Sequence, residues 1–349
     1  MAIDWRAGYS ASWRLFKVDR ETWADARLVP GVTSVSVERS IDEDAPTIEG
    51  GTLEVDVSSG ETFEEGYYRV VMVAEQGGSR ERVDVCTLLC SATSGDIARG
   101  NDAITVSGGS VLVPASKRML DAGSYAPAGV DGVRFAADML AQSINAPVES
   151  QGGFTLDEAY VFDNGTSALE AVWKVLRAGG YTIQIQGDGT VRVTPLPDVP
   201  DLPLDAAGAR LLHDGIHHEL DYSEVPNRYI AADAGVEAVA SNDDPGSPTS
   251  FVTRGWHSDI RDDSPTRVNG ETLQAYAERR LEEESTVWDV RSYEREWWPG
   301  VFPDSLVRGS LASVLLDGDL RITRQSLACG RGIVVTEEAR KEVKTWRRQ

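Results

Sequence analysis

The first 115 residues alternate between apolar and polar side chains with a period of two, and this pattern constrains the fold more than any other feature. Val35 and Val37 alternate with serine and glutamate, and Leu53, Val55 and Val57 alternate with glutamate and aspartate. A period of two places successive side chains on opposite faces, so these segments predict half-buried antiparallel strands. Further strands are predicted near residues 13–18, 67–73, 83–89 and 103–106. Short strands separated by glycine and proline turns, without a helix, predict a small barrel or sandwich.

Residues 116–203 change to a helical pattern. Asp131 is placed to cap a helix with apolar residues three and four apart that ends at residue 145. Ser167 and Glu170 form the capping box of a second helix, which a pair of glycines ends at residue 179. A hairpin with a glycine turn is predicted over residues 181–194.

The last third of the chain returns to strands. We predict strands near 218–222 and 227–232, a helix over 271–285, and strands over 287–297, 311–316, 320–326 and 332–336. Asp317 and Gly318 are assigned to a hairpin turn.

A length of 349 residues exceeds what one hydrophobic core usually serves, so two or three domains of about 100 to 150 residues each are expected. The predicted fold class is α+β and mostly β, with two β-barrel-like domains flanking a small α/β middle domain. The predicted boundaries are 1–115 for the N-terminal β-barrel-like domain, 116–203 for the middle domain, and 204–349 for a second β-domain with one helix.

The charge balance excludes some classes of partner. The chain has 56 acidic and 34 basic residues and a formal net charge of −22. Proteins that grip phosphates need clustered cations, so sequence-specific binding of DNA and binding to anionic membranes are disfavoured. A surface past which DNA slides without sticking has this sign, as do many proteins whose charge only keeps them soluble. No apolar run has the length of a membrane span or a signal-peptide core, so we expect synthesis and folding in the cytosol.

Cysteine and histidine do not have the spacing of a metal site. Cys86 and Cys90 share one face of a predicted strand, and Cys329 lies far from them in sequence, so buried free thiols are expected. The chain has four histidines. His213, His217 and His218 cluster around an Asp-Gly turn, and His257 lies apart in sequence. They do not form an HExxH motif, and we predict no metal ligand and no cofactor.

Catalytic motifs are equally absent from the sequence. Three carboxylate pairs lie in segments rich in turn formers, where a solvated charge is the common role: Glu43 and Asp44, Asp243 and Asp244, and Asp262 and Asp263. Residues 317–319 are too short for a calcium loop. Neither a nucleophile elbow nor a phosphate-binding or dinucleotide-binding loop occurs. We therefore predict no catalytic residue and no enzymatic activity.

Two groups of residues suggest contacts with other molecules. The nine tryptophans include Trp5, Trp13 and Trp23 early and Trp288, Trp297, Trp298 and Trp346 late. Exposed rows of them would bind sugar or a protein partner, whereas packing in cores and subunit interfaces is the alternative that we favour. The cations near the C-terminus either dock on an acidic neighbour or form a solvated end: Arg340, Lys341, Lys344, Arg347 and Arg348.

The order of these parts resembles phage tail proteins of the baseplate hub family. In that family, β-domains also flank a helix and hairpin in the middle of the chain. The resemblance rests on five segments, which are Ser110–Asp121, Pro127–Asp131, Asp163–Ile185, Gly187–Val193 and Val225–Ala231, and on the late helix near Leu273–Leu281.

The resemblance implies a structural hub subunit at the distal end of a phage or prophage tail. Hubs of this family form a homotrimeric ring with pseudo-sixfold symmetry, which adapts the sixfold tail tube to a threefold tip. The implied partners are the distal tail ring and a tip or spike protein, with DNA passing through the lumen, and the implied location is the virion. A wall-degrading domain of some relatives is not expected in this chain. Two alternatives stay open: a carbohydrate-binding or glycoside-hydrolysing β-protein, and a structural protein of a secretion apparatus related to phage tails.

Overall fold

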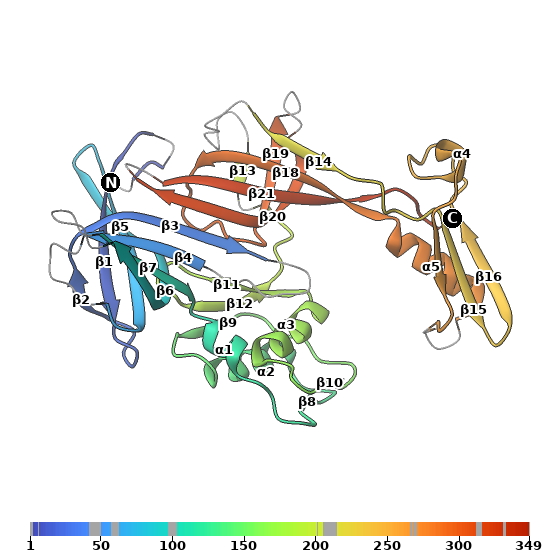
Figure 1. Cartoon of the computed structure of the whole chain (residues 1–349), viewed down its shortest axis with the longest axis horizontal. Helices are drawn as coiled ribbons and strands as arrows, with labels where there is room; N and C mark the ends of the chain where they lie inside the picture. Colours follow the sequence, from blue (N-terminus) through green and yellow to red (C-terminus); the bar gives the residue numbers. More distant parts are fainter. Residues whose placement is uncertain are drawn as a thin grey trace. The chain divides into compact units, whose positions relative to one another are not determined.

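The computed structural model describes residues 3–5, 7–41, 50–56, 63–96, 103–200, 202–204, 215–265, 267, 271–311, 316–330 and 333–348 (Figure 1). The chain divides into two compact units. The major unit comprises residues 1–216 and 292–339, and the minor unit comprises residues 217–291 and 340–349. The chain is mostly β-sheet with a few short helices, as the sequence predicts. The predicted division into three domains at residues 115 and 203 stays a prediction.

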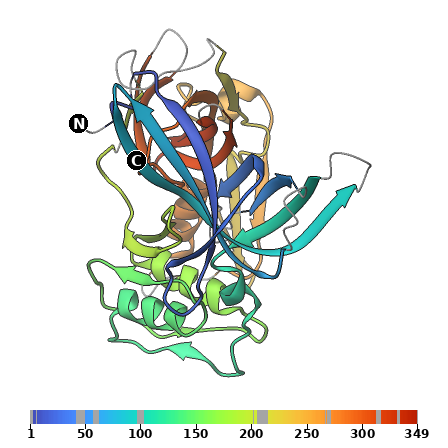
Figure 2. The same cartoon turned by 90° about the vertical axis from the view of Figure 1, so that its left-hand side faces the viewer.

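Seven strands from the N-terminal third form one antiparallel part of the sheet in the major unit. They are β1 (Ser10–Val18), β2 (Asp25–Val29), β3 (Val32–Ser40), β4 (Gly50–Asp56), β5 (Gly66–Gln76), β6 (Ser79–Asp96) and β7 (Ala103–Ser110). Their spatial order is β3-β4-β7-β6-β5-β1-β2. Residues 67–74 of β5 are all buried, which explains why this strand is almost continuously apolar in sequence. The sheet is curled rather than flat (Figure 2).

Strands from the end of the chain extend the same sheet. They are β18 (Thr286–Glu296), β19 (Leu306–Leu311), β20 (Leu316–Cys329) and β21 (Ile333–Lys344), and β13 (Leu202–Leu204) pairs with β19. β20 pairs with β3, where Leu327 lies opposite Val37 and Cys329 opposite Val35. These four side chains belong to one buried cluster. The first and last strands of the major unit therefore share a hydrophobic core.

The middle of the chain supplies the helices of the major unit. They are α1 (Val113–Lys117), α2 (Gly132–Ala141) and α3 (Ala168–Ala178), followed by the hairpin strands β11 (Tyr181–Ile185) and β12 (Val191–Pro195), with β9 (Val148–Ser150) beside β12. Both predicted caps are confirmed. Asp131 accepts hydrogen bonds from the amides of Val133 and Arg134, and Ser167 and Glu170 bond reciprocally.

The turn between β11 and β12 docks against the N-terminal strands. Arg69, which is 6% exposed, donates to the Asp188 carbonyl oxygen (3.0 Å) and to Asp25 Oδ1 (2.8 Å). Thr87 Oγ1 donates to the Gly187 carbonyl oxygen (3.0 Å). A Cβ atom on Gly187 would lie 1.7 Å from the Asp84 carbonyl oxygen, so only glycine allows this approach.

A second joint ties the middle segment to the C-terminal strands. Asp304 is 2% exposed and has a φ angle of 69°. Its Oδ2 atom accepts hydrogen bonds from Thr182 Oγ1 (2.5 Å) and Arg177 Nη2 (2.8 Å). A non-glycine residue in the left-handed region is uncommon, although aspartate tolerates it better than most residues. The two charge-assisted contacts stabilise this conformation.

A buried ion pair joins three of the C-terminal strands. Arg295 of β18 donates to both carboxylate oxygens of Glu337 on β21, at 2.8 and 2.5 Å, and both side chains are 0% exposed. Gln325 of β20 donates to the same carboxylate at 2.7 Å. This network satisfies the charge of Glu337 inside the major unit, as buried ions require.

The minor unit contains a three-stranded sheet covered by one helix. The sheet consists of β16 (Val236–Ser241), β15 (Arg228–Asp233) and β17 (Asp259–Asp262) in that order. The covering helix is α5 (Leu273–Glu284), close to the predicted 271–285. Tyr229 and Ala231 of β15 pack against Tyr276 and Leu281 of α5. The remaining elements are β14 (His217–Leu220) and α4 (Phe251–Arg254).

The structure corrects the turn that was predicted at residues 317–318. These residues lie inside β20, whose partner β19 ends at Leu311. Gly318 faces Gly309 across the pair, and its φ angle of 87° is accommodated within the strand. Asp319 lies opposite Arg308, and their side chains form an ion pair with contacts of 2.6 and 2.9 Å. The cross-strand pair and the facing glycines explain why aspartate and glycine do not mark a reversal here.

Replacing Gly187 by alanine tests the docked turn. The added methyl group would overlap the Asp84 carbonyl, so we expect a loss of about 1–3 kcal/mol in the free energy of unfolding, measured by urea denaturation. Gly215→Ala is the matched control, because a Cβ atom there meets nothing within 4 Å. An unchanged stability of Gly187→Ala would contradict the docking of this turn.

Replacing Glu337 by glutamine tests the buried ion pair. The change leaves the Arg295 guanidinium buried without its counter-charge, which costs about 3–5 kcal/mol in the free energy of unfolding. The control is Asp319→Asn, which removes an exposed partner of Arg308 and should change stability little. Equal losses in the two variants, measured by urea denaturation, would be inconsistent with a dry ion pair.

Candidate functional site

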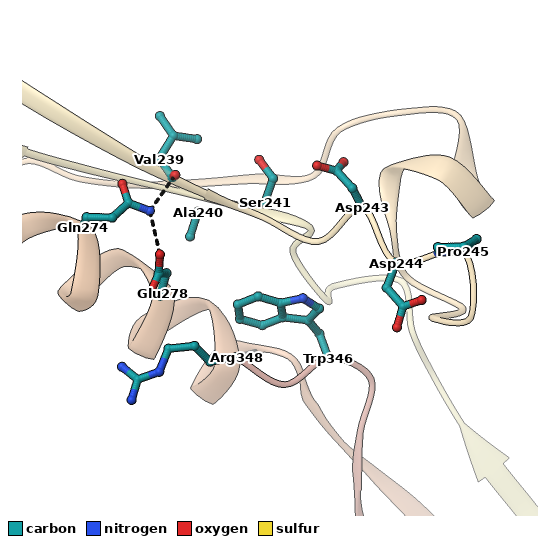
Figure 3. A pocket seen from close by; sticks show the side chains of 10 residues that line it. All are labelled: Val239, Ala240, Ser241, Asp243, Asp244, Pro245, Gln274, Glu278, Trp346 and Arg348. Carbon is teal, nitrogen blue, oxygen red and sulfur yellow. Dashed lines mark hydrogen bonds between the residues drawn. The ribbon is translucent and has the colours of Figure 1, made fainter.

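The pocket in Figure 3 lies in the minor unit between α5, the end of β16 and the C-terminal residues Trp346 and Arg348. Its volume is about 580 Å³. Gln274 donates from Nε2 to the Val239 carbonyl oxygen (3.2 Å) and to Glu278 Oε1 (2.9 Å). The first of these bonds covers a backbone acceptor on the edge strand β16, which hinders the addition of another strand there.

The lining of the pocket contains neither a histidine nor a cysteine. Its polar lining consists of carboxylates, one amide, one guanidinium and the Ser241 hydroxyl, and no histidine is among the lining residues. Trp346 forms part of the wall and packs on the core of the minor unit. The predicted pair Asp243 and Asp244 lies at this pocket, and Asp244 Oδ1 accepts from the Gly246 amide at 2.8 Å. The carboxylates of Asp243, Asp244 and Glu278 give the pocket the charge to contact a cationic group of a partner.

Of the other two predicted carboxylate pairs, the structure describes only Asp262 and Asp263. Asp262 accepts hydrogen bonds from the hydroxyls of Tyr276 (2.6 Å) and Tyr229 (3.3 Å), and the Tyr276 bond lowers the pKa of this carboxyl. Asp263 forms an ion pair with Arg261 at 2.9 Å. A lowered pKa keeps Asp262 ionised, which is the opposite of what a general acid needs. Glu43 and Asp44 lie outside the described residues.

The described histidines have different surroundings. His217 is exposed, and His218 Nε2 lies 3.2 Å from Asp289 Oδ1. His257 stacks on Phe251 with ring centroids 4.2 Å apart, and His213 lies outside the described residues. Within the described ranges, no three histidine, cysteine, aspartate or glutamate side chains are grouped so that they could hold a metal ion.

Asp289 is a buried carboxylate of the minor unit with cationic side chains around it. Its carboxylate contacts the Arg291 guanidinium, and Lys341 Nζ lies 3.6 Å away. Burial raises the pKa of Asp289, although Lys341 acts in the opposite direction. These contacts link β14, β18 and β21 within this unit, so we assign Asp289 a structural role.

The cysteines are buried in the core that the two ends of the chain share. Cys86, Cys90 and Cys329 are free, as the sequence predicts. Burial raises the pKa of Cys90 and of Cys329 to about 12, so their thiols stay protonated near neutral pH. A nucleophilic role requires the thiolate, which these positions disfavour.

The tryptophans do not form an exposed row. All nine lie in described parts of the chain, and Trp256 is the one among them that is exposed, with 50% of its surface accessible. Trp288 is covered by the Arg340 guanidinium, 3.9 Å from the ring centroid. Three cations of the C-terminal segment thus have partners within the chain. Arg340 contacts Trp288, Lys341 Nζ lies 3.6 Å from Asp289, and Lys344 Nζ lies 3.5 Å from Glu342.

Two exposed apolar surfaces were not found from the sequence. The first, which we call the knob, comprises residues 250–258 around α4 and exposes Phe251, Val252 and Trp256. The second, which we call the ribbon, comprises residues 119–126 and 155–163 around β8 (Tyr125–Ala126) and β10 (Tyr160–Val161). Residue type alone does not separate exposed from core apolar side chains, although Ser250 and Gly255 are the capping signals of α4.

Within the described residues, no helix is long and apolar enough to span a membrane.

The comparisons with known proteins concern the fold. No protein-family model matches the chain, and no curated protein does. The 43 kDa tail protein of prophage MuSo2 from Shewanella oneidensis has a similar structure, with a TM-score of 0.59 and 13% identity over 95% of this chain and 98% of that chain. The tail protein from Neisseria meningitidis MC58 has a TM-score of 0.62 and 13% identity over 96% and 97% of the two chains. A chain of the Francisella PdpA–VgrG complex has a TM-score of 0.53 and 7% identity over 96% of this chain and 58% of that one. The chain therefore has the fold of phage tail proteins, which confirms the resemblance drawn from its sequence.

Proposed function

We propose that the chain is a structural subunit of a phage or prophage tail that acts through contacts with other subunits. The observation that carries this proposal is the match over the whole chain to two prophage or bacterial tail proteins, at TM-scores of 0.59 and 0.62. A match over the full length of both chains supports a role of the whole chain rather than of one shared module.

Within the tail, we propose the position of the hub at the distal end, where a homotrimeric ring adapts the sixfold tube to a threefold tip. The distal tail ring and a tip or spike protein are the proposed neighbours, and the virion is the proposed location. The net charge of −22 supports passage of DNA through such a ring without binding, because phosphates are repelled.

We propose further that the chain is not an enzyme. In the pocket of Figure 3, the Ser241 hydroxyl has neither a histidine nor a thiol among the other lining residues, and Asp262 accepts hydrogen bonds from two tyrosine hydroxyls. The alternative of sugar binding requires aromatic platforms open to solvent. Of the nine described tryptophans, Trp256 alone is exposed, at 50% of its surface, which argues against an extended platform of this kind.

The mass of the purified chain in solution tests the proposal. Light scattering after gel filtration should give about 114 kDa, which is three times the chain mass of 37.9 kDa. A titration with cell-wall glycans, followed by tryptophan fluorescence, serves as the control for the sugar-binding alternative and should cause no quenching. A monomer whose fluorescence is quenched by a glycan would contradict the hub and favour the alternative.

A further inference from the structure

The knob presents large apolar side chains to solvent. Phe251 is 37% exposed, Val252 57% and Trp256 50%. The Phe251 ring stacks on His257, and the Arg254 guanidinium lies 4.8 Å from the centroid of the Trp256 ring. Tryptophan and arginine are the residues that most often carry the binding energy of protein interfaces.

A buried polar network holds the knob in one conformation. Asn242 and Thr249 beneath it are 0% exposed, and Asn242 Nδ2 donates to Ser247 Oγ at 2.9 Å. Thr249 Oγ1 donates to Thr345 Oγ1 at 3.0 Å, and Arg254 Nη1 donates to the Val225 carbonyl oxygen at 2.7 Å. An interface whose side chains are already ordered loses less entropy on binding, so this frame suits the knob for docking.

The charge of the knob differs from that of the chain as a whole. Residues 250–258 contain Arg254 and His257 but no carboxylate, whereas the chain carries a net charge of −22. Two copies of so acidic a chain repel each other over most of their surface. Contact between copies is least unfavourable where one side lacks carboxylates and carries a cation.

The ribbon also exposes apolar side chains, but its charge is opposite to that of the knob. Tyr125 and Val161 lie directly opposite each other in the β8–β10 pair and are 55% and 68% exposed, and Met119 is 58% exposed. The other face of the pair, with Ala126 and Tyr160, packs on a buried cluster. The two segments of the ribbon carry four exposed carboxylates and no cation; these are Asp121, Asp157, Glu158 and Asp163.

We propose that the knob of one copy docks on the ribbon of the next copy. Apolar side chains meet at the centre of this contact, and the cationic side of the knob faces the carboxylates of the ribbon. The two surfaces differ, so the contact is heterologous, and a heterologous contact closes into a ring when its rotation allows. This inference rests on the proposed homotrimer and names the surfaces that build it.

Disulfide trapping between copies tests the contact directly. Val252→Cys and Val161→Cys are prepared as separate full-length variants, mixed, and exposed to oxidised glutathione. The native cysteines are buried and should not interfere. A covalent dimer that forms in the mixture and in neither variant alone is expected. The control mixture of Val236→Cys with Val161→Cys should give none, since Val236 is equally exposed but lies at the far end of β16. Absence of the mixed dimer would overturn the proposal.

Charge variants separate this contact from the homotrimer itself. Val252→Glu places a carboxylate in the knob and should weaken self-association roughly a hundredfold by light scattering, whereas Val236→Glu should not. Adding Asp157→Lys and Glu158→Lys to Val252→Glu should restore association. A Val252→Glu variant that is folded and still trimeric would overturn the knob contact and leave the hub proposal standing. A wild-type chain that stays monomeric would contradict both.

Discussion

The pairing of β20 with β3 is the contact on which the rest of the major unit depends. It places Leu327 and Cys329 beside Val37 and Val35, so that residues about 290 positions apart in the chain bury one another. Both β20 and β3 lie inside the sheet, between β21 and β4. If this pair opened, two inner strands would lose their backbone partners and the apolar cluster between them would meet water. The N-terminal strands and the C-terminal strands of the major unit therefore share one core.

The middle segment is fixed to this body by polar contacts at both sides. Arg69 and Thr87 hold the turn at Gly187 against the N-terminal strands, and Asp304 holds α3 and β11 against the C-terminal strands. Hydrogen bonds of this kind are directional, so they fix orientation as well as proximity. A subunit of a ring needs such a fixed orientation, because its contact surfaces must meet those of its neighbours at one angle.

The elements that the sequence predicts correctly are those that depend on residues close together in the chain. Asp131 and the Ser167–Glu170 box cap helices through residues two or three positions away, and both caps are present. Alternation predicts β3 and β4 because each strand has one apolar face. The pairing of β3 with β20 could not be predicted, because the local sequence pattern of a strand does not specify a partner about 290 residues away. The turn assigned to Asp317 and Gly318 was wrong because Gly318 faces Gly309 and Asp319 pairs with Arg308 across β19. The knob and the ribbon were missed because exposure depends on the complete fold.

The pairing of β3 with β20 makes both strands parts of one cooperative sheet. Hydrogen exchange of the two strands, followed by mass spectrometry at increasing urea concentration, tests it most directly. If the strands form one sheet, their amides exchange through the same opening and show the same free energy of protection. Exchange of β20 through an opening of low free energy, while β3 stays protected, would contradict this cooperativity.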